Sequence, residues 1–355
     1  MTRAARPILI TGGAGFIGSN LADRLAGDGH DLIVLDALSR PGVERNLAWL
    51  KERHAGRITH VAADIRDEDE VARAAAEAKA VFHMAAQVAV TTSLDDPRED
   101  FDINVRGTLN LLDAIRLRGE PVPVIFASTN KVYGDLADLE IVERGGRYCP
   151  DRLLAGRGIG EDRPLDFHTP YGCSKGAADQ YVLDYARSYG IPTVVFRMSC
   201  IYGRRQMGTE DQGWVAHFLI RALAGEPITI YGDGKQVRDI LDVSDAVDAY
   251  VRALTRIDHV AGQAFNLGGG AANAVSLRQL VDEIRSATFR DVPLRFEDWR
   301  QGDQRWYVSD TAKARSALGL AAPLGWRDGV RRLADWLASE RGQLLQVERT
   351  LSAAE

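Results

Sequence analysis

The sequence predicts an α/β protein in which a doubly wound parallel sheet is combined with a smaller C-terminal α/β lobe. Short apolar runs alternate with amphipathic helical runs through the first half of the chain. This alternation is typical of a parallel sheet covered by helices on both faces. A glycine-rich turn at residues 11–18 also joins the first apolar run to the first helical run, as in folds that bind dinucleotides.

The predicted strands are short apolar runs, at 8–10, 32–35, 58–61, 80–84, 122–127 and 193–196. The predicted helices carry apolar residues at helical spacing, at 16–26, 68–78, 98–117 and 174–188. After residue 197 the alternation weakens and Gly and Pro become more frequent. We therefore expect a nucleotide-binding domain at 1–197, with returning pieces near 227–262 that include the strand 228–231, and a substrate lobe made of 198–226 and 263–340.

The segment 134–169 interrupts the alternation and is rich in Gly, Arg and Asp. A loop of this length inside a domain is usually functional or mobile. We interpret it as a flap over the substrate cleft, and a disordered surface insert is the alternative.

Composition and charge exclude several classes of protein. The 355 residues are 45% hydrophobic and 26% charged, as in an ordinary water-soluble globular protein. A net charge of -6 argues against a general nucleic-acid binder or a protein of acidic membrane surfaces. Cys149, Cys173 and Cys200 have no paired spacing, which indicates free thiols in a reducing cytoplasm. No signal peptide, membrane span or metal-ligand spacing is evident.

The turn after the first strand carries three regularly spaced glycines. Gly12 is expected to make the tight turn, Gly15 to let the backbone approach a pyrophosphate, and Gly18 to let the helix pack on the sheet. Phe16 and Ile17 begin that helix, and helix N-termini bind phosphate. The alternative is a loop whose glycines serve only for turning.

Asp36 ends the second apolar strand, eighteen residues beyond Gly18. An acid at this place can accept hydrogen bonds from the hydroxyls of an adenosine ribose, and its charge repels a 2′-phosphate. The sequence therefore favours NAD over NADP, although the nearby Arg40 keeps NADP open. A helix-capping or turn aspartate is the alternative.

Tyr171 and Lys175 lie four residues apart at the predicted start of a helix, so both side chains point off one face. We expect the lysine to lower the pKa of the phenol, which can then take a proton from a substrate hydroxyl. Thr129 follows the strand 122–127 at the carboxyl edge of the sheet, where its hydroxyl can bridge the substrate and the phenol. The alternatives are a surface tyrosine beside a solvated lysine, and ordinary turn chemistry at the threonine.

Together these motifs resemble the extended short-chain dehydrogenase/reductase family of nucleotide-sugar epimerases and dehydratases, from residue 8 to about 337. The resemblance implies a Rossmann-type sheet, tightly bound NAD, and catalysis by Thr129, Tyr171 and Lys175. It also implies further cofactor contacts, at Asp64, Ile65, Ala85, Ala86, Gln87 and Asn104.

The stretches 128–135, 170–180 and 211–215 are similar to those members of the family that epimerise C2 of a CDP-hexose. Dehydratases of the family usually carry Asp-Glu after the catalytic threonine, and this chain has Asn130 and Lys131 instead. The usual acid for elimination is therefore missing, although Lys131 could act as a base.

The implied substrate contacts are Asn130, Lys131, Cys200, Arg205, Gln206, Arg238 and Arg300. Arg238 and Arg300 resemble the family's diphosphate-binding arginines, because a guanidinium group can bind phosphate through two donors. Solvated surface charges are the alternative for both. Cys200 stands where the family leads us to expect serine, which leaves the identity of the sugar open.

The resemblance implies an isomerase that oxidises the sugar transiently to a keto sugar and returns the hydride. The first alternative is a UDP- or GDP-sugar 4-epimerase, which would use the same three catalytic residues. The less favoured alternatives are a nucleotide-sugar dehydratase and a non-catalytic NAD-binding protein. The resemblance also implies a homodimer or homotetramer built from the helices near 100–117 and 174–188, whose apolar faces could instead fill the core of a monomer.

Overall fold

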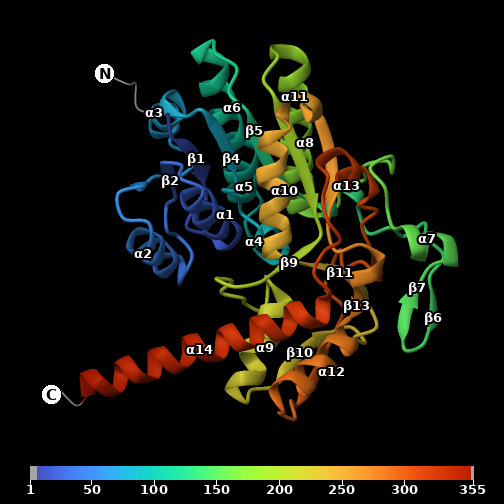
Figure 1. The fold of residues 1–355 in the computed structure, drawn as a ribbon. Helices are drawn as coiled ribbons and strands as arrows, with labels where there is room; N and C mark the ends of the chain where they lie inside the picture. Colours follow the sequence, from blue (N-terminus) through green and yellow to red (C-terminus); the bar gives the residue numbers. More distant parts are fainter. Residues whose placement is uncertain (1–5, 353–355) are drawn as a thin grey trace.

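The computed structural model describes residues 6–352 and is organised around a seven-stranded parallel sheet, with a second lobe of smaller sheets beside it (Figure 1). In spatial order the strands of the large sheet are β12 (Gln263–Leu267), β8 (Thr193–Met198), β5 (Val124–Thr129), β4 (Ala80–His83), β1 (Ile8–Thr11), β2 (Leu32–Leu35) and β3 (Ile58–Val61). Their side chains are mostly buried because helices cover both faces.

The order of the strands reverses direction at β1. From β1 the chain moves outward to β2 and β3 on one side, and from β4 to β5, β8 and β12 on the other. The connections after β1 and β4 therefore leave in opposite directions, and a crevice forms at the carboxyl ends of these two strands. Ligands of doubly wound sheets bind at such a switch point.

Two hydrophobic cores hold the helices on the sheet. One face is covered by α1 (Phe16–Gly27), α2 (Val43–Arg53), α10 (Val243–Thr255), α11 (Ile257–Val260) and α13 (Ala312–Leu318). The other is covered mainly by α3 (Glu68–Glu77), α6 (Gly107–Arg118) and α8 (Thr169–Tyr189), with the short α4 (Val90–Asp95) and α5 (Pro97–Phe101) against α8. The predicted doubly wound α/β architecture is thus confirmed.

Most predicted strands and helices of the first half end within two residues of their expected ends, but α8 begins five residues earlier than expected and α2 was not predicted. The helix expected over 98–117 is divided into α5, a π-helical segment at Asp102–Arg106, and α6. Such segments often occur at functional sites. Gly107 follows the π-helical segment. A Cβ atom at this position would lie 2.6 Å from Ile65 Cγ2, so only glycine fits there without a shift.

The second lobe contains β9 (Cys200–Tyr202), β11 (Val237–Asp242), β13 (Ala274–Ser276) and β15 (Trp306–Tyr307) in one sheet, and β10 (Ile228–Tyr231) with β14 (Leu294–Glu297) in another. Its core is completed by α9 (Trp214–Ala224), α12 (Leu277–Thr288) and α14 (Trp326–Ser352). Figure 1 shows α14 extending from this lobe toward the side of the molecule that carries α2.

One predicted strand placement is wrong. The strand at 228–231 does not return to the large sheet, because β10 pairs with β14 in the second lobe. The strand that completes the large sheet is β12, which pairs with β8 and lies just beyond the expected returning pieces. Ile228 and Ile230 are buried among residues of α9 and α12. The burial of these two side chains in the second lobe holds the strand there. The division into two domains otherwise stays a prediction.

The segment 134–169 is neither a flap nor a disordered insert. It holds a hairpin of β6 (Val142–Arg144) and β7 (Arg147–Cys149) and the helix α7 (Arg152–Arg157). Leu136 and Ile159 pack with Tyr307 and Val308 in a small core of their own. Among the residues that line the main cavity, none lies between 134 and 169.

Across residues 6–352, no helix combines the length and the apolar character that crossing a membrane requires.

Candidate active site

A cavity of about 620 Å³ runs from the carboxyl ends of β1 and β4 to the second lobe. This volume lies in the range of cofactor and substrate sites. The cavity contains the glycine turn at one end and two arginines at the other, with the catalytic candidates between them. The large sheet and the second lobe therefore share a single site.

The glycine turn leaves no room for a side chain at Gly12. Gly12 has a φ of +67°, and a Cβ atom there would lie 2.7 Å from the backbone nitrogen of Ala85 on the loop after β4. Gly15 caps α1 without any side-chain hydrogen bond, so the first N–H groups of the helix, at Phe16 and Ile17, are free of capping partners. Both residues line the cavity. This cradle fits the pyrophosphate of NAD.

Asp36 ends β2 at the wall of the same cavity. Its Oδ2 accepts a hydrogen bond from the Ala14 N–H and its Oδ1 accepts one from the Leu38 N–H, each at 2.9 Å. Each oxygen keeps a lone pair for a ribose hydroxyl. Arg40 also lines this part of the cavity, and burial lowers the pKa of its guanidinium group.

The predicted adenine contacts lie beside Asp36. Asp64 and Ile65 follow β3 and line the cavity. The side chain of Arg66 binds Asp64 through two hydrogen bonds of 2.8 Å and holds the pKa of that carboxyl below its usual value. Ala85 and Ala86 form the opposite wall after β4.

Thr129, Tyr171 and Lys175 are brought together between the two ends of the cavity. Thr129 ends β5, and the other two lie in the first turns of α8. The Thr129 side chain lies beside the Tyr171 phenol, where it partly offsets the effect of burial on the pKa of the phenol. The Lys175 ammonium nitrogen lies 4.2 Å from the centre of the Phe126 ring. These contacts can hold a substrate hydroxyl beside the phenol.

The expected lowering of the Tyr171 pKa by Lys175 is not seen. Burial raises the pKa of Tyr171 to about 12 and lowers the pKa of Lys175 to about 7. Desolvation of each charged form is therefore the dominant influence in the protein alone. When bound, NAD would supply the hydride acceptor and a positively charged ring, and a positive charge near the phenol would favour the phenolate.

A buried ion pair supports the catalytic residues from behind. Asp179 on α8 accepts hydrogen bonds from Arg197 Nε and Nη2, each at 3.0 Å, and from the Ser128 hydroxyl at 2.8 Å. Ser128 precedes Thr129 in β5, and Asp179 lies one turn beyond Lys175 in α8. The contacts of Asp179 with Ser128 and Arg197 therefore fix β5 relative to α8.

We expect Asp179→Ala to lower the free energy of unfolding by about 3–5 kcal/mol, because Arg197 would remain buried without a countercharge. Chemical denaturation measures this effect. Asp184→Ala, on the exposed side of the same helix, is the control and should change stability little. A loss of less than about 1 kcal/mol in the Asp179 variant would contradict the assigned role.

Asn130 and Lys131 follow Thr129 and line the cavity. The Asn130 amide donates a hydrogen bond of 3.2 Å to Gln304 Oε1, and Lys131 Nζ donates one of 2.9 Å to the Gly302 carbonyl. Burial lowers the pKa of Lys131 to about 8.

Cys200 and Gln206 lie on the wall that the second lobe contributes. The Cys200 thiol accepts a hydrogen bond of 3.3 Å from the Trp214 indole, and burial raises its pKa. Gln206 donates to the Ile201 carbonyl, whereas its buried Oε1 has no partner within the described chain. That oxygen can accept a hydrogen bond from a ligand.

Arg238 and Arg300 line the far end of the cavity. Arg238 Nη2 lies 2.5 Å from Asp303 Oδ1. The Arg300 guanidinium carbon lies 3.8 Å from the centre of the Tyr231 ring, and its Nη2 lies 3.2 Å from Asp211 Oδ1. Two guanidinium groups on one wall suit a diphosphate.

The sequence of this chain matches the family described as the NAD dependent epimerase/dehydratase family over residues 8–268. The chain belongs to this family.

The relatives and solved structures that this chain resembles include a 2-epimerase and 4-epimerases. CDP-paratose 2-epimerase of Salmonella typhi is 45% identical over 94% of this chain and 99% of that protein. The structure of UDP-glucose 4-epimerase from Thermotoga maritima with UDP-glucose has a TM-score of 0.80 and 29% identity, covering 94% of this chain and 99% of that one. The Thermus thermophilus UDP-glucose 4-epimerase complex with NAD has a TM-score of 0.77 and 31% identity, covering 93% and 98%.

Three predicted contacts of this epimerase/dehydratase family member lie outside the cavity lining. Gln87 and Asn104 bind one another instead, since the Gln87 N–H donates to Asn104 Oδ1 at 3.0 Å. Asn104 also donates to Ser174 Oγ at 3.0 Å, which ties the loop after β4 to α8. Arg205 is turned away from the cavity and packs between two tryptophans.

Sequence reasoning missed several residues that line the site of this family member. They share a position at the carboxyl edge of the large sheet or on the facing second lobe, and include Thr91, Met198, Ser199, Glu210, His217, Thr229, Tyr231, Gln236 and Asp303. The buried hydroxyl of Thr91 and Oε1 of Gln236 have no partner within the described chain. The place of Thr91 at the start of α4, the first helix after β4, could have indicated it as a lining residue.

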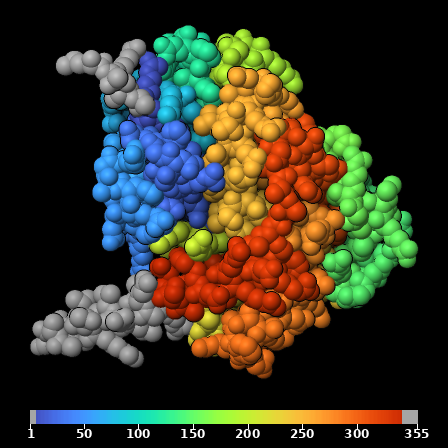
Figure 2. Space-filling model, viewed as in Figure 1, coloured from blue at the N-terminus to red at the C-terminus, as the bar shows by residue number. Residues whose placement is uncertain are grey.

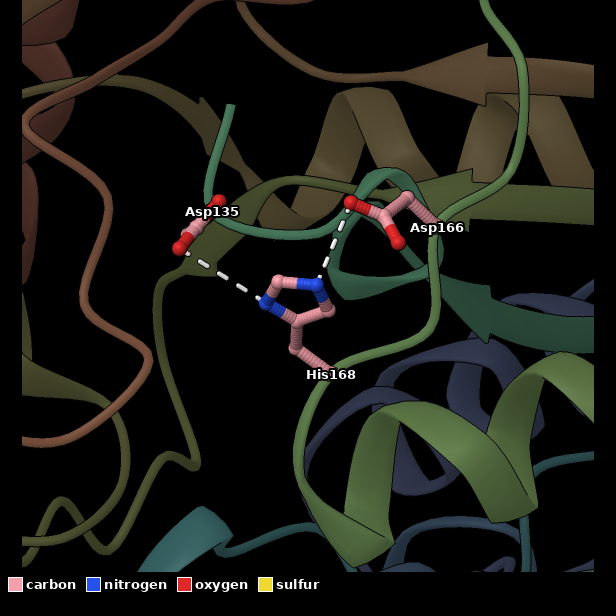
Figure 3. Close-up of side chains that lie close together, drawn as sticks. All are labelled: Asp135, Asp166 and His168. Carbon is pink, nitrogen blue, oxygen red and sulfur yellow. Dashed lines mark ion pairs between the residues drawn. The ribbon is translucent and has the colours of Figure 1, made fainter. Parts of the chain in front are cut away.

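A cluster of Asp135, Asp166 and His168 lies away from the cavity lining (Figure 3). His168 Nε2 is 3.1 Å from Asp166 Oδ2, and His168 Nδ1 is 3.6 Å from Asp135 Oδ2. The two ring nitrogens thus face different carboxylates, as Figure 3 shows, so the imidazole separates the two acids. These ion pairs join His168, the residue before α8, to two aspartates of the segment 134–169.

Proposed function

We propose that this protein is an NAD-dependent nucleotide-sugar epimerase that inverts C2 of a CDP-hexose. Thr129 orients the reacting hydroxyl, Tyr171 takes and returns its proton, and Lys175 supports Tyr171 beside the cofactor. Arg238 and Arg300 hold the diphosphate, while Asn130, Lys131, Cys200 and Gln206 surround the sugar.

The pair of residues after Thr129 carries this proposal. Elimination needs an acid that protonates the leaving hydroxyl. Asn130 is an amide held by Gln304, and Lys131 is held by the Gly302 carbonyl. Oxidation and return of the hydride need only NAD as the hydride acceptor, together with the threonine and the phenol. This favours epimerisation over dehydration, and the 45% identity to a protein named CDP-paratose 2-epimerase supports CDP and C2.

A label-tracing experiment distinguishes C2 from C4. CDP-, UDP- and GDP-hexoses are first screened for turnover, with NMR of the products. The accepted substrate is then prepared with deuterium at C2 or at C4 and incubated in ordinary water. We expect inversion at C2 with the C2 label retained in the product.

Inversion at C4 with an internally returned C4 label would instead support the UDP- or GDP-sugar 4-epimerase. Release of water and formation of a 4-keto-6-deoxy sugar would establish a dehydratase. Bound NAD without turnover of any nucleotide hexose would support a non-catalytic protein.

Lys131 predicts a pH dependence of substrate binding. Its pKa is lowered to about 8, so the side chain is cationic below this pH and neutral above it. We expect KM for the anionic substrate to rise about threefold to tenfold between about pH 7 and about pH 9. Steady-state kinetics measure this change, and Lys131→Met should remove it. A step of the same size in the variant would show that another group is responsible.

We also propose a homodimer or homotetramer in the cytoplasm. Phe101, Leu117, Tyr181 and Tyr189 are large apolar or aromatic side chains exposed on α5, α6 and α8. Their exposure supports an interface on this side of the sheet. Cys149, Cys173 and Cys200 are free, which supports a reducing compartment. Analytical ultracentrifugation measures the oligomeric state, and a purely monomeric species would contradict the first part.

A further inference from the structure

Arg205 lies in the loop between β9 and α9 and is unusually constrained for a residue outside the cavity. Its φ is +69°, in the left-handed region that residues other than glycine rarely adopt. Its guanidinium carbon lies 4.1 Å from the centre of the Trp49 ring and 5.5 Å from that of Trp336. Its Nη2 lies 3.8 Å from Glu340 Oε1. Such a conformation persists only where the surroundings hold it.

The two aromatic rings belong to different hydrophobic cores. Trp49, on α2, packs against the core of the large sheet, whereas Trp336, on α14, packs against the core of the second lobe. Arg205 between them therefore fastens the lobes together. In Figure 2 a yellow-green band, from the segment that follows β9, lies between the blue surface of α1 and α2 and the red surface of α14.

The backbone of the same loop is bound to the glycine turn. The buried Asn46 side chain donates to the Ala14 carbonyl and to the Arg205 carbonyl, each at 3.2 Å. The Asn20 side chain donates to the Phe16 carbonyl at 2.8 Å and to the Arg204 carbonyl at 2.9 Å. Two asparagines thus bridge the glycine turn and residues 204–205.

The residues that follow Arg205 extend this contact along the nucleotide end of the cavity. Gln206 lines the cavity. Met207 lies against Gly42, where a Cβ atom would be 3.0 Å from its Cγ. Gly42 in turn caps α2, whose first residue, Val43, lines the cavity. Residues 204–207 therefore touch both the glycine turn and the start of α2.

We propose that residues 204–207 form a strap that keeps the glycine turn in its NAD-binding conformation, with Arg205 as its anchor and α14 as the element that fastens it. The strap slows release of NAD. An enzyme that returns the hydride to the same sugar has to keep its cofactor through the whole cycle, so this property matters whichever carbon reacts. The inference goes beyond the proposed function and stands or falls independently of it.

The test measures exchange of NAD and needs no sugar substrate. Protein purified with bound NAD is mixed with excess isotopically labelled NAD, and replacement is followed by mass spectrometry. We expect Arg205→Ala to exchange NAD about tenfold faster than the wild type, because the cation–π contacts are lost. Arg24→Ala is the control, since Arg24 is an exposed residue of α1 paired with Asp28, and it should exchange at the wild-type rate.

Arg205→Gly separates the side chain from the backbone. Glycine adopts the observed φ without strain, so fast exchange in this variant assigns the effect to the lost anchor. Trp336→Leu removes one ring of the anchor from the other lobe and should also exchange faster. Melting temperatures show whether each variant is folded. Wild-type exchange rates in folded Arg205→Gly and Trp336→Leu would overturn the proposal, even if Arg205→Ala exchanges faster or fails to fold.

Discussion

Tyr171→Phe is expected to lower kcat by about 10³-fold while NAD stays bound, because the variant loses only the oxygen that exchanges the proton. Tyr171 is 8% exposed, and phenylalanine fills the same space apart from the phenol oxygen. Thr129 cannot replace the phenol, since its hydroxyl is a far weaker acid. Turnover of the nucleotide hexose found in the screen gives kcat, and NAD released by denaturation gives the occupancy.

Tyr181→Phe is the matched control for this variant. Tyr181 lies on the same helix α8 and is 44% exposed, so the identical chemical change should leave kcat unaltered. Unchanged turnover in Tyr171→Phe would remove the phenol from the mechanism. A loss of bound NAD would instead show that the phenol acts mainly in holding the cofactor.

Gly18→Ala is expected to reduce the NAD content of the purified protein to less than about a tenth of the wild-type value. A Cβ atom at Gly18 would collide with the Gly12 carbonyl oxygen and lie 2.7 Å from Gly13 Cα. Both obstacles are backbone, so the turn itself has to move, and the pyrophosphate cradle is lost with it. NAD content and isothermal titration with added NAD measure the effect.

Gly27→Ala supplies the control, because it makes the same substitution in the same helix. The nearest atom to a Cβ at Gly27, His54 Cε1, is 4.0 Å away, so NAD content should match that of the wild type. A folded Gly18→Ala protein with full NAD content would show that the close packing of this helix on the turn is not required for binding.

Local signals were sufficient to predict much of the fold and of the cofactor end of the site. Three features illustrate this: the glycine turn, Asp36 and the Tyr171–Lys175 pair. Each lies within one strand–turn–helix unit or one helix start, so a short stretch of sequence determines how its residues are placed relative to one another. The cavity lining includes all of them. Their individual roles stay predictions until the variants are measured.

The remaining features depend on contacts between segments distant in the sequence. Arg205 resembled a substrate contact, but its orientation is set by Trp49 and Trp336, which lie more than a hundred residues away on either side. Burial raises the pKa of Tyr171 to about 12, and spacing along one helix carries no information on burial. The strand 228–231 was misplaced because its partner, β14, has no recognisable pairing signal.

The π-helical segment at Asp102–Arg106 has a consequence for how this chain tolerates deletions. A π-helical turn accommodates one residue more than a regular turn of the same height. Removing a single residue there would restore a regular turn, and the helices before and after it would keep their relative alignment. Asn104 lies inside the bulge and would lose the position from which it binds Gln87 and Ser174, each at 3.0 Å. The surplus residue thus directs one side chain toward two neighbouring elements without changing the course of the helix.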